Sequence, residues 1–136
     1  MPSSIDMPNT LLDLPYHVTS IDEVMKALPE LRWKVRDTAG GGRIVYAHIV
    51  GNKETQEKWV ACAAEKGGSF PLHQHGAGGE MTLTIVGVLT ETYEGKETEL
   101  GPGSVLFRGG GTIHSSKAEK FWFGIYYQPD GSKEVK

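Results

Sequence analysis

Two histidines, a glycine-rich bend and a glutamate form the stretch of this 136-residue sequence with the clearest potential for chemistry. In HQHGAGGE, His73 and His75 lie two positions apart, and Glu80 follows after GAGG. Alternate side chains of a β-strand share one face, so both imidazoles can reach one ion. Glycines let the chain bend and bring the Glu80 carboxylate to the same point. His114 follows a second glycine-rich bend, RGGGTI, and is the candidate third imidazole.

Three imidazoles and one carboxylate make a donor set that accepts several divalent transition metals: iron, manganese, nickel, copper or zinc. A six-coordinate ion would keep two positions for water, oxygen or a chelating substrate, whereas a four-coordinate zinc would form a closed, structural site. The residues alone leave both alternatives open. Glu80 is the informative ligand, because its carboxylate can bind the ion tightly or leave it and act as a general base. We therefore predict Glu80 as the catalytic residue.

Other residues with potential chemistry have less support from their neighbours. Arg108 lies six positions before His114 and is predicted to pair with a substrate carboxylate; an exposed salt bridge is the alternative. His17 and His48 have no other candidate ligand at a suitable spacing, so they are expected to have packing or surface roles. Cys62 lies in the apolar stretch KWVACAAE and is expected to be buried. Five aromatic residues are expected in the core or in the wall of a pocket: Tyr46, Phe70, Phe107, Trp122 and Tyr126.

The segments that carry these residues have the pattern of short β-strands separated by glycine-rich turns. The expected strands are RIVYAHIV (43–50), KWVACAA (58–64), SFPLHQH (69–75), EMTLTIVGVLTETY (80–93), KETEL (96–100), SVLFR (104–108), IHSSKA (113–118) and FWFGIYY (121–127). Most of the 18 glycines lie between them. Such regular spacing predicts an all-β fold, an antiparallel sandwich or barrel, rather than a βαβ protein.

One short helix is expected before the strands. Ser20 is a candidate N-cap, Glu23 has the capping-box spacing, and Pro29 ends the pattern, which predicts a helix over 21–28. The chain is long enough for one hydrophobic core, so we expect a single folded domain. Its predicted parts are an N-terminal extension with the short helix (1–40), a barrel (41–128) and a frayed tail (129–136).

Composition and charge favour a small-molecule ligand as the partner. The 17 acidic and 14 basic residues are interspersed and give a net charge of -3, which offers no surface for nucleic acid or an anionic membrane. Apolar runs are too short to span a bilayer, and the first residues lack the features of a signal peptide, so we expect a cytoplasmic protein. A single cysteine excludes an internal disulfide.

The residues around the candidate ligands resemble the two sequence motifs of the cupins. Gly67 to Gly87, GGSFPLHQHGAGGEMTLTIVG, is similar to the first motif, GxxxxxHxHxxxxExxxxxxG, at every specified position. GSVLFRGGGTIH is similar to the second motif, GxxxxxPxGxxH, except that Gly109 replaces the proline. The resemblance implies a cupin antiparallel β-barrel, or jelly roll, with a divalent metal in its interior. It also implies the ligand set His73, His75, Glu80 and His114.

Within the cupins, the short spacing between the motifs and the loop GAGGE resemble two kinds of small single-domain cupin. These are the cupin domain of ChrR-type anti-sigma factors and the acetylacetone-cleaving dioxygenases. The second resemblance implies a metal-dependent oxygenase that acts on a small dicarbonyl-like or acidic organic substrate. The first implies a sensor module that binds zinc or an effector without turnover. A sugar isomerase has less support, because the strand after Glu80 offers few polar groups for hydroxyls.

The strands at 80–89 and 121–127 are apolar on both faces. Strict alternation puts Val86 on the face of Glu80 and Ile85 on the opposite face. A sheet that is apolar on both faces needs a cover on its outer side, either the first 40 residues or a second subunit. We predict a homodimer.

Overall fold

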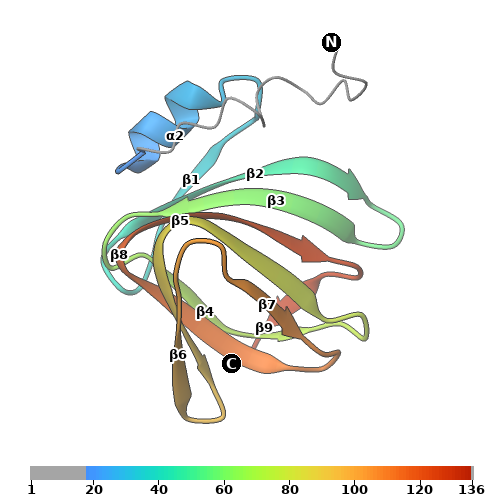
Figure 1. Ribbon diagram of the computed structural model, residues 1–136. Helices are drawn as coiled ribbons and strands as arrows, with labels where there is room; N and C mark the ends of the chain where they lie inside the picture. Colours follow the sequence, from blue (N-terminus) through green and yellow to red (C-terminus); the bar gives the residue numbers. More distant parts are fainter. Residues whose placement is uncertain (1–17, 136) are drawn as a thin grey trace, which may run out of the picture.

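The computed structural model describes residues 18–135 as a curled antiparallel sheet with one short helix, α2 (Ile21–Ala27), on its outer face (Figure 1). The strands are β1 (Lys34–Asp37), β2 (Arg43–Asn52), β3 (Glu57–Ala64), β4 (Ser69–His75), β5 (Glu80–Tyr93), β6 (Lys96–Leu100), β7 (Val105–Arg108), β8 (Ile113–Gln128) and β9 (Ser132–Glu134). The all-β prediction is confirmed. The expectation for His17 lies outside the described residues. Within them, no helix is both long enough and apolar enough to cross a membrane.

The long strand β8 closes the sheet into a barrel. The strand order is β1-β2-β3-β8-β4-β9, and β5 pairs with β6, β7 and β8. The second half of β8 pairs with β3 and the first half with β4, while β5 follows β8 along most of its length. Two strands were predicted here, at 113–118 and 121–127. The intervening residues continue β8 through a register shift against β5 instead of forming a turn.

Two short strands lie where the sequence analysis placed none. β1 falls in the predicted extension 1–40 and pairs with β2, and β9 falls in the predicted frayed tail 129–136 and pairs with β4. The tail prediction is therefore wrong for residues 132–134. Every residue of both strands is exposed, so neither has the alternation that reveals a half-buried strand. Backbone hydrogen bonds to a neighbouring edge hold them in place.

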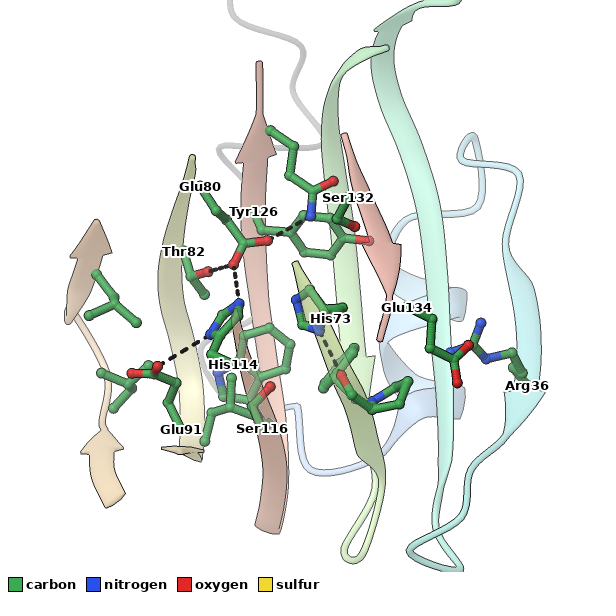
Figure 2. Close-up of a pocket in the computed structure, with 17 residues that line it drawn as sticks. Arg36, His73, Glu80, Thr82, Glu91, His114, Ser116, Tyr126, Ser132 and Glu134 are labelled. Carbon is green, nitrogen blue, oxygen red and sulfur yellow. Dashed lines mark hydrogen bonds and ion pairs between the residues drawn. The ribbon is translucent and has the colours of Figure 1, made fainter. Parts of the chain in front are cut away.

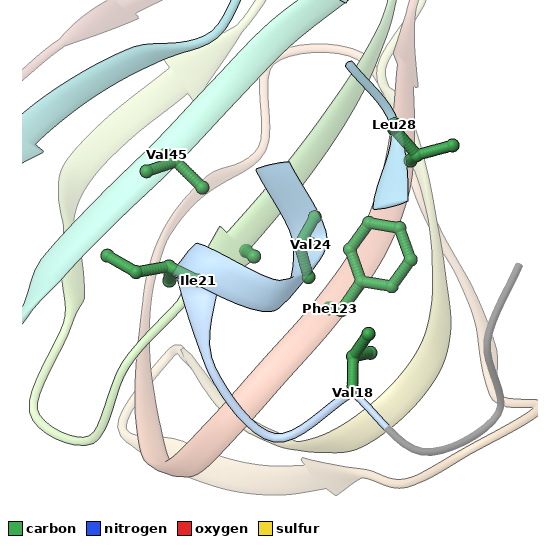
Figure 3. Packing of buried hydrophobic residues seen from close by; sticks show 7 residues of the cluster. Val18, Ile21, Val24, Leu28, Val45 and Phe123 are labelled. Atoms are coloured by element: carbon green, nitrogen blue, oxygen red, sulfur yellow. The ribbon is translucent and has the colours of Figure 1, made fainter. Parts of the chain in front are cut away.

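Apolar side chains pack in two clusters, one inside the barrel and one between the sheet and α2. Figure 3 shows the outer cluster, in which helix residues pack against Val45 and Phe123 of the sheet. The helix begins at the predicted N-cap, where the Ser20 hydroxyl accepts a hydrogen bond from the Glu23 amide at 3.2 Å. The predicted helix over 21–28 is confirmed to within one residue. It covers one part of the outer sheet face.

A bulge in β5 changes which residues face the barrel interior. Opposite β8, Thr84 pairs with Gly124 and Val86 with Phe123, so β5 contains one extra residue at this point. Ile85 and Val86 both pack against the outer cluster. The predicted alternation is therefore wrong at Val86. Beyond the bulge, odd-numbered residues of β5 face the interior.

Candidate metal centre

Three strands bring the four predicted ligands together at one end of the barrel interior. His73 and His75 lie at the end of β4, Glu80 begins β5, and His114 lies near the start of β8, directly opposite His73 in the register. One possible ligand atom from each side chain lies within 4.8 Å of the others. Figure 2 shows Glu80, His73 and His114 converging from different strands.

Glycines set the backbone geometry between these strands. Gly79 has a φ of 74°, and a Cβ on it would lie 2.0 Å from the Arg108 carbonyl oxygen. A Cβ on Gly110 would lie 2.0 Å from the carbonyl oxygen of Ala77. Both distances are far shorter than van der Waals contact. The backbones of the two glycine-rich loops can therefore pack this closely only because Gly79 and Gly110 have no side chain. The glycines thereby fix the starting points of β5 and β8.

The distances among the donor atoms of His75, His114 and Glu80 fit a shared ion. The Nε2 atoms of His75 and His114 are 2.6 Å apart, and Glu80 Oε1 lies 3.3 and 3.5 Å from them. Two ligand atoms at about 2.1 Å from an ion lie about 3 Å apart when they bind at right angles. Imidazole nitrogens and a carboxylate oxygen are donors that divalent transition metals accept. The group therefore fits the metal that the sequence motifs imply.

Hydrogen bonds orient two of the imidazole rings. The Nδ1 atom of His73 lies 2.7 Å from the Pro71 carbonyl oxygen, and that of His114 lies 3.2 Å from Glu91 Oε1. Each bond leaves Nε2 free to face the cluster, as is usual for histidines that bind metals. The Nδ1 atom of His75 is buried and has no partner among the described residues. Burial lowers the pKa of His73 and of His114, so both rings are neutral at pH 7 and able to bind a metal.

Glu80 is buried and is held at both carboxylate oxygens. Gln128 donates its Nε2 to Glu80 Oε2 at 2.7 Å, and the Thr82 hydroxyl donates to Oε1 at 3.3 Å. Burial by itself would raise the pKa of Glu80, but hydrogen bonds and charge, chiefly from His75, outweigh it and hold the pKa below its usual value. Glu80 is therefore a carboxylate at neutral pH, with Oε1 directed at the histidine nitrogens.

The structure places Arg108 on a buried carboxylate that the sequence analysis did not identify. Glu91 is 1% exposed, and its two carboxylate oxygens accept from Nε of Arg108 at 3.0 Å and from its Nη2. The guanidinium also lies 4.4 Å from the centre of the Tyr93 ring. Arg108 does not line the cavity beside the metal cluster. Contact between Arg108 and a substrate stays a prediction, and its placement gives no support for it.

A cavity of about 280 Å³ adjoins the ligand cluster inside the barrel. His73, Glu80 and His114 form part of its wall. Of the five aromatic residues considered above, Phe70, Trp122 and Tyr126 line it, Tyr46 packs against the inner cluster, and Phe107 is exposed on the outer face. Cys62 is buried in the inner cluster as predicted. The exposed His48 lies on β2, outside the ligand cluster.

Comparisons with known proteins identify the fold through structure alone. No protein-family model matches the sequence, and no curated protein matches it. A proposed acetylacetone dioxygenase from Methylibium petroleiphilum superposes with a TM-score of 0.66 at 14% sequence identity, over 79% of this chain and 77% of that one. A predicted oxalate decarboxylase from Thermotoga maritima superposes with a TM-score of 0.64 at 17% identity, over 88% and 100% of the two chains.

A third solved structure has a similar fold. KdgF from Halomonas sp. superposes with a TM-score of 0.60 at 20% identity, over 74% of this chain and 88% of that one. Solved structures described as cupins are similar too. The chain therefore has the cupin fold, a jelly-roll β-barrel, as the sequence motifs implied. At these identities the likeness concerns the fold, and the function has to be argued from the site.

Proposed function

We propose that this protein is a metal-dependent oxygenase that cleaves a small β-dicarbonyl compound. The observation that carries the proposal is the position of the donor cluster in the wall of a cavity rather than in a closed core. Four protein ligands on a six-coordinate ion leave two positions for other ligands, and a β-dicarbonyl has two oxygens spaced to chelate. The similarity to a proposed acetylacetone dioxygenase agrees with this choice.

The residues around the cavity suit such a substrate. Phe70, Leu106 and Trp122 give the cavity an apolar wall, which keeps water away from the reacting atoms. A ferrous ion bound here would supply the one-electron chemistry with dioxygen that oxidative carbon–carbon cleavage requires. Glu80, fixed by Gln128, would tune the ion or take the proton that the dicarbonyl loses on binding. With acetylacetone the balanced reaction consumes one O₂ and gives acetic acid and methylglyoxal.

Oxygen consumption by defined metal forms tests this proposal. We expect the iron(II)-loaded protein to consume oxygen with acetylacetone and to release methylglyoxal and acetic acid in equal amounts. The metal-free and zinc-loaded proteins should consume none. An oxygen electrode and chromatographic analysis of the products measure both results. Tightly retained zinc, and no oxygen uptake by the iron form with any β-dicarbonyl, would contradict the oxygenase and favour a zinc- or effector-binding sensor module.

We also propose that the protein is a homodimer formed through the outer face of the sheet. Five apolar residues on neighbouring strands make a continuous row across this face, in the order Val50, Trp59, Tyr127, Met81 and Phe107. Phe107 is 72% exposed. Exposed apolar rows of this kind favour association, because burying them removes apolar surface from water. A second copy would present the same row by two-fold symmetry.

A charge placed in this row should separate the subunits. We expect light scattering to give twice the mass of one chain for the parent protein at micromolar concentration. Phe107→Asp should give the mass of one chain, because it would place a carboxylate in an apolar interface. Val35→Asp is the control, since Val35 is also exposed but lies on β1, outside the row. A parent protein that is monomeric at this concentration would contradict the dimer.

A further inference from the structure

The cavity has one cationic side chain in its wall, and it comes from a strand that the sequence analysis did not predict. Arg36 of β1 is the only lysine or arginine among the described residues that line the cavity. Figure 2 shows Arg36 on the side of His73 away from His114 and Glu91. The side chain is exposed and forms no ion pair with any acid of residues 18–135. Among residues 18–135, its guanidinium donors therefore have no ion-pair partner and can bind an anion.

Two of the three acidic residues in the wall have partners that occupy them. Glu80 belongs to the ligand cluster, and Glu91 binds Arg108 and His114. Glu134, on β9, remains and lies on the same side of the cavity as Arg36 in Figure 2. No ion pair joins Glu134 to Arg36. Of the described residues, this side of the cavity therefore offers one cation without an ion-pair partner beside one carboxylate, and Glu134 would repel a second negative charge on a ligand.

We infer that Arg36 forms a subsite for a single carboxylate, so that the substrate is a β-dicarbonyl compound with an anionic tail. This inference rests on the proposed function, because it assigns the dicarbonyl end to the donor cluster. A guanidinium binds a carboxylate through two parallel hydrogen bonds, which gives both affinity and orientation. Apolar residues of the cavity wall would contact the carbon chain that joins the two ends.

Three ligands with the same chelating head separate this inference from the proposed function. Acetylacetone has no charged tail, 2,4-dioxopentanoate has a carboxylate in place of one methyl group, and 4,6-dioxoheptanoate has a carboxylate two methylenes further out. Isothermal titration calorimetry on the full-length, cobalt(II)-loaded protein without oxygen measures binding without turnover. We expect at least one carboxylate ligand to bind about 10- to 100-fold more tightly than acetylacetone, the range of a charge-assisted hydrogen bond.

Variants of Arg36 and Glu134 test whether Arg36 causes the preference for carboxylate ligands over acetylacetone. Arg36→Gln should remove the advantage of the carboxylate ligands and leave acetylacetone binding unchanged. Arg32→Gln, at an exposed arginine outside the cavity wall, should change neither. Glu134→Gln should strengthen carboxylate binding, because it removes the competing negative charge. Acetylacetone binding without a carboxylate advantage, or an advantage that survives in Arg36→Gln, would overturn the subsite alone. No binding by any of the three ligands would overturn the proposed function and the subsite with it.

Discussion

The Glu80→Gln protein should still bind metal through its three histidines. Its rate of substrate turnover, measured as oxygen uptake, should fall about 100-fold or more. The substitution nearly preserves shape and removes the charge. In the parent, Glu80 Oε2 accepts from Gln128 while Oε1 faces the histidine nitrogens. If the oxygen of the new glutamine still accepts a hydrogen bond from Gln128, its NH₂ group faces the ion. An amide NH₂ group does not bind a metal ion. We expect metal affinity to fall about 100-fold, at the upper end of the range for changing an outer partner of a ligand, because a direct ligand is lost while three histidines remain.

Metal content, melting temperature and oxygen uptake, measured together, decide how Glu80 acts. Glu97→Gln is the matched control, because Glu97 is an exposed acid on the β6 hairpin, and all three values should stay at the parent level. In an open site, Glu80→Gln keeps metal and melting temperature while oxygen uptake collapses. In a closed four-coordinate site, metal and melting temperature fall together, because binding of the ion supports the fold. That second result would contradict the open site that the proposed oxygenase needs.

The four-residue cluster could be predicted from the sequence because it depends on short-range geometry. His73 and His75 share a face through strand alternation, and GAGG sets a short turn to Glu80. His114 needs one longer step, which is the pairing of β4 with β8. The second cupin motif supplies this step, since it fixes a histidine after a glycine-rich bend. The fold could be predicted for a similar reason, because its turns and half-buried strands leave a regular pattern in the sequence.

Glu91 could not be predicted in the same way. It lies eleven positions after Glu80, and an odd separation along a regular strand puts two residues on opposite faces. The extra residue at Ile85 and Val86 shifts the alternation, so that Glu91 faces the interior with Glu80. Gly87, with a φ of 81°, lies beside this irregularity, and a glycine inside a strand is the one sign of it in the sequence. Nothing in the sequence shows where the extra residue lies.

The two arginines show the same limit over longer distances. Closeness to His114 in sequence predicts a site role for Arg108, but the position of its partner Glu91 depends on the bulge in β5. Arg36 reaches the cavity because β1 pairs with the edge of β2. All four residues of β1 are exposed, so no apolar pattern in the sequence reveals this pairing. Edge strands pair through backbone atoms, which all residues share. Their side chains therefore reach a site without a local signal.

Glu91→Gln should lower metal affinity about 10- to 100-fold, although Glu91 is not a ligand. Its carboxylate accepts from His114 Nδ1 and from Arg108, and so fixes the ring that directs Nε2 at the cluster. A neutral amide accepts a weaker bond from the ring and leaves the guanidinium of Arg108, which is only 20% exposed, without its counter-charge. We also expect the visible spectrum of the cobalt(II) form to change, because the orientation of the His114 ring sets part of the ligand field.

Two further variants separate ring positioning from general destabilisation. Arg108→Gln removes the same ion pair but keeps the bond between Glu91 and His114, so it should lower the melting temperature of the metal-free protein with a smaller loss of metal affinity. Glu99→Gln, at an exposed acid of β6, should change neither value. We therefore expect metal affinity to be highest in Glu99→Gln, at the parent level, lower in Arg108→Gln and lowest in Glu91→Gln. Equal losses of affinity in Arg108→Gln and Glu91→Gln, with an unchanged cobalt spectrum in both, would show that Glu91 stabilises the barrel without orienting His114.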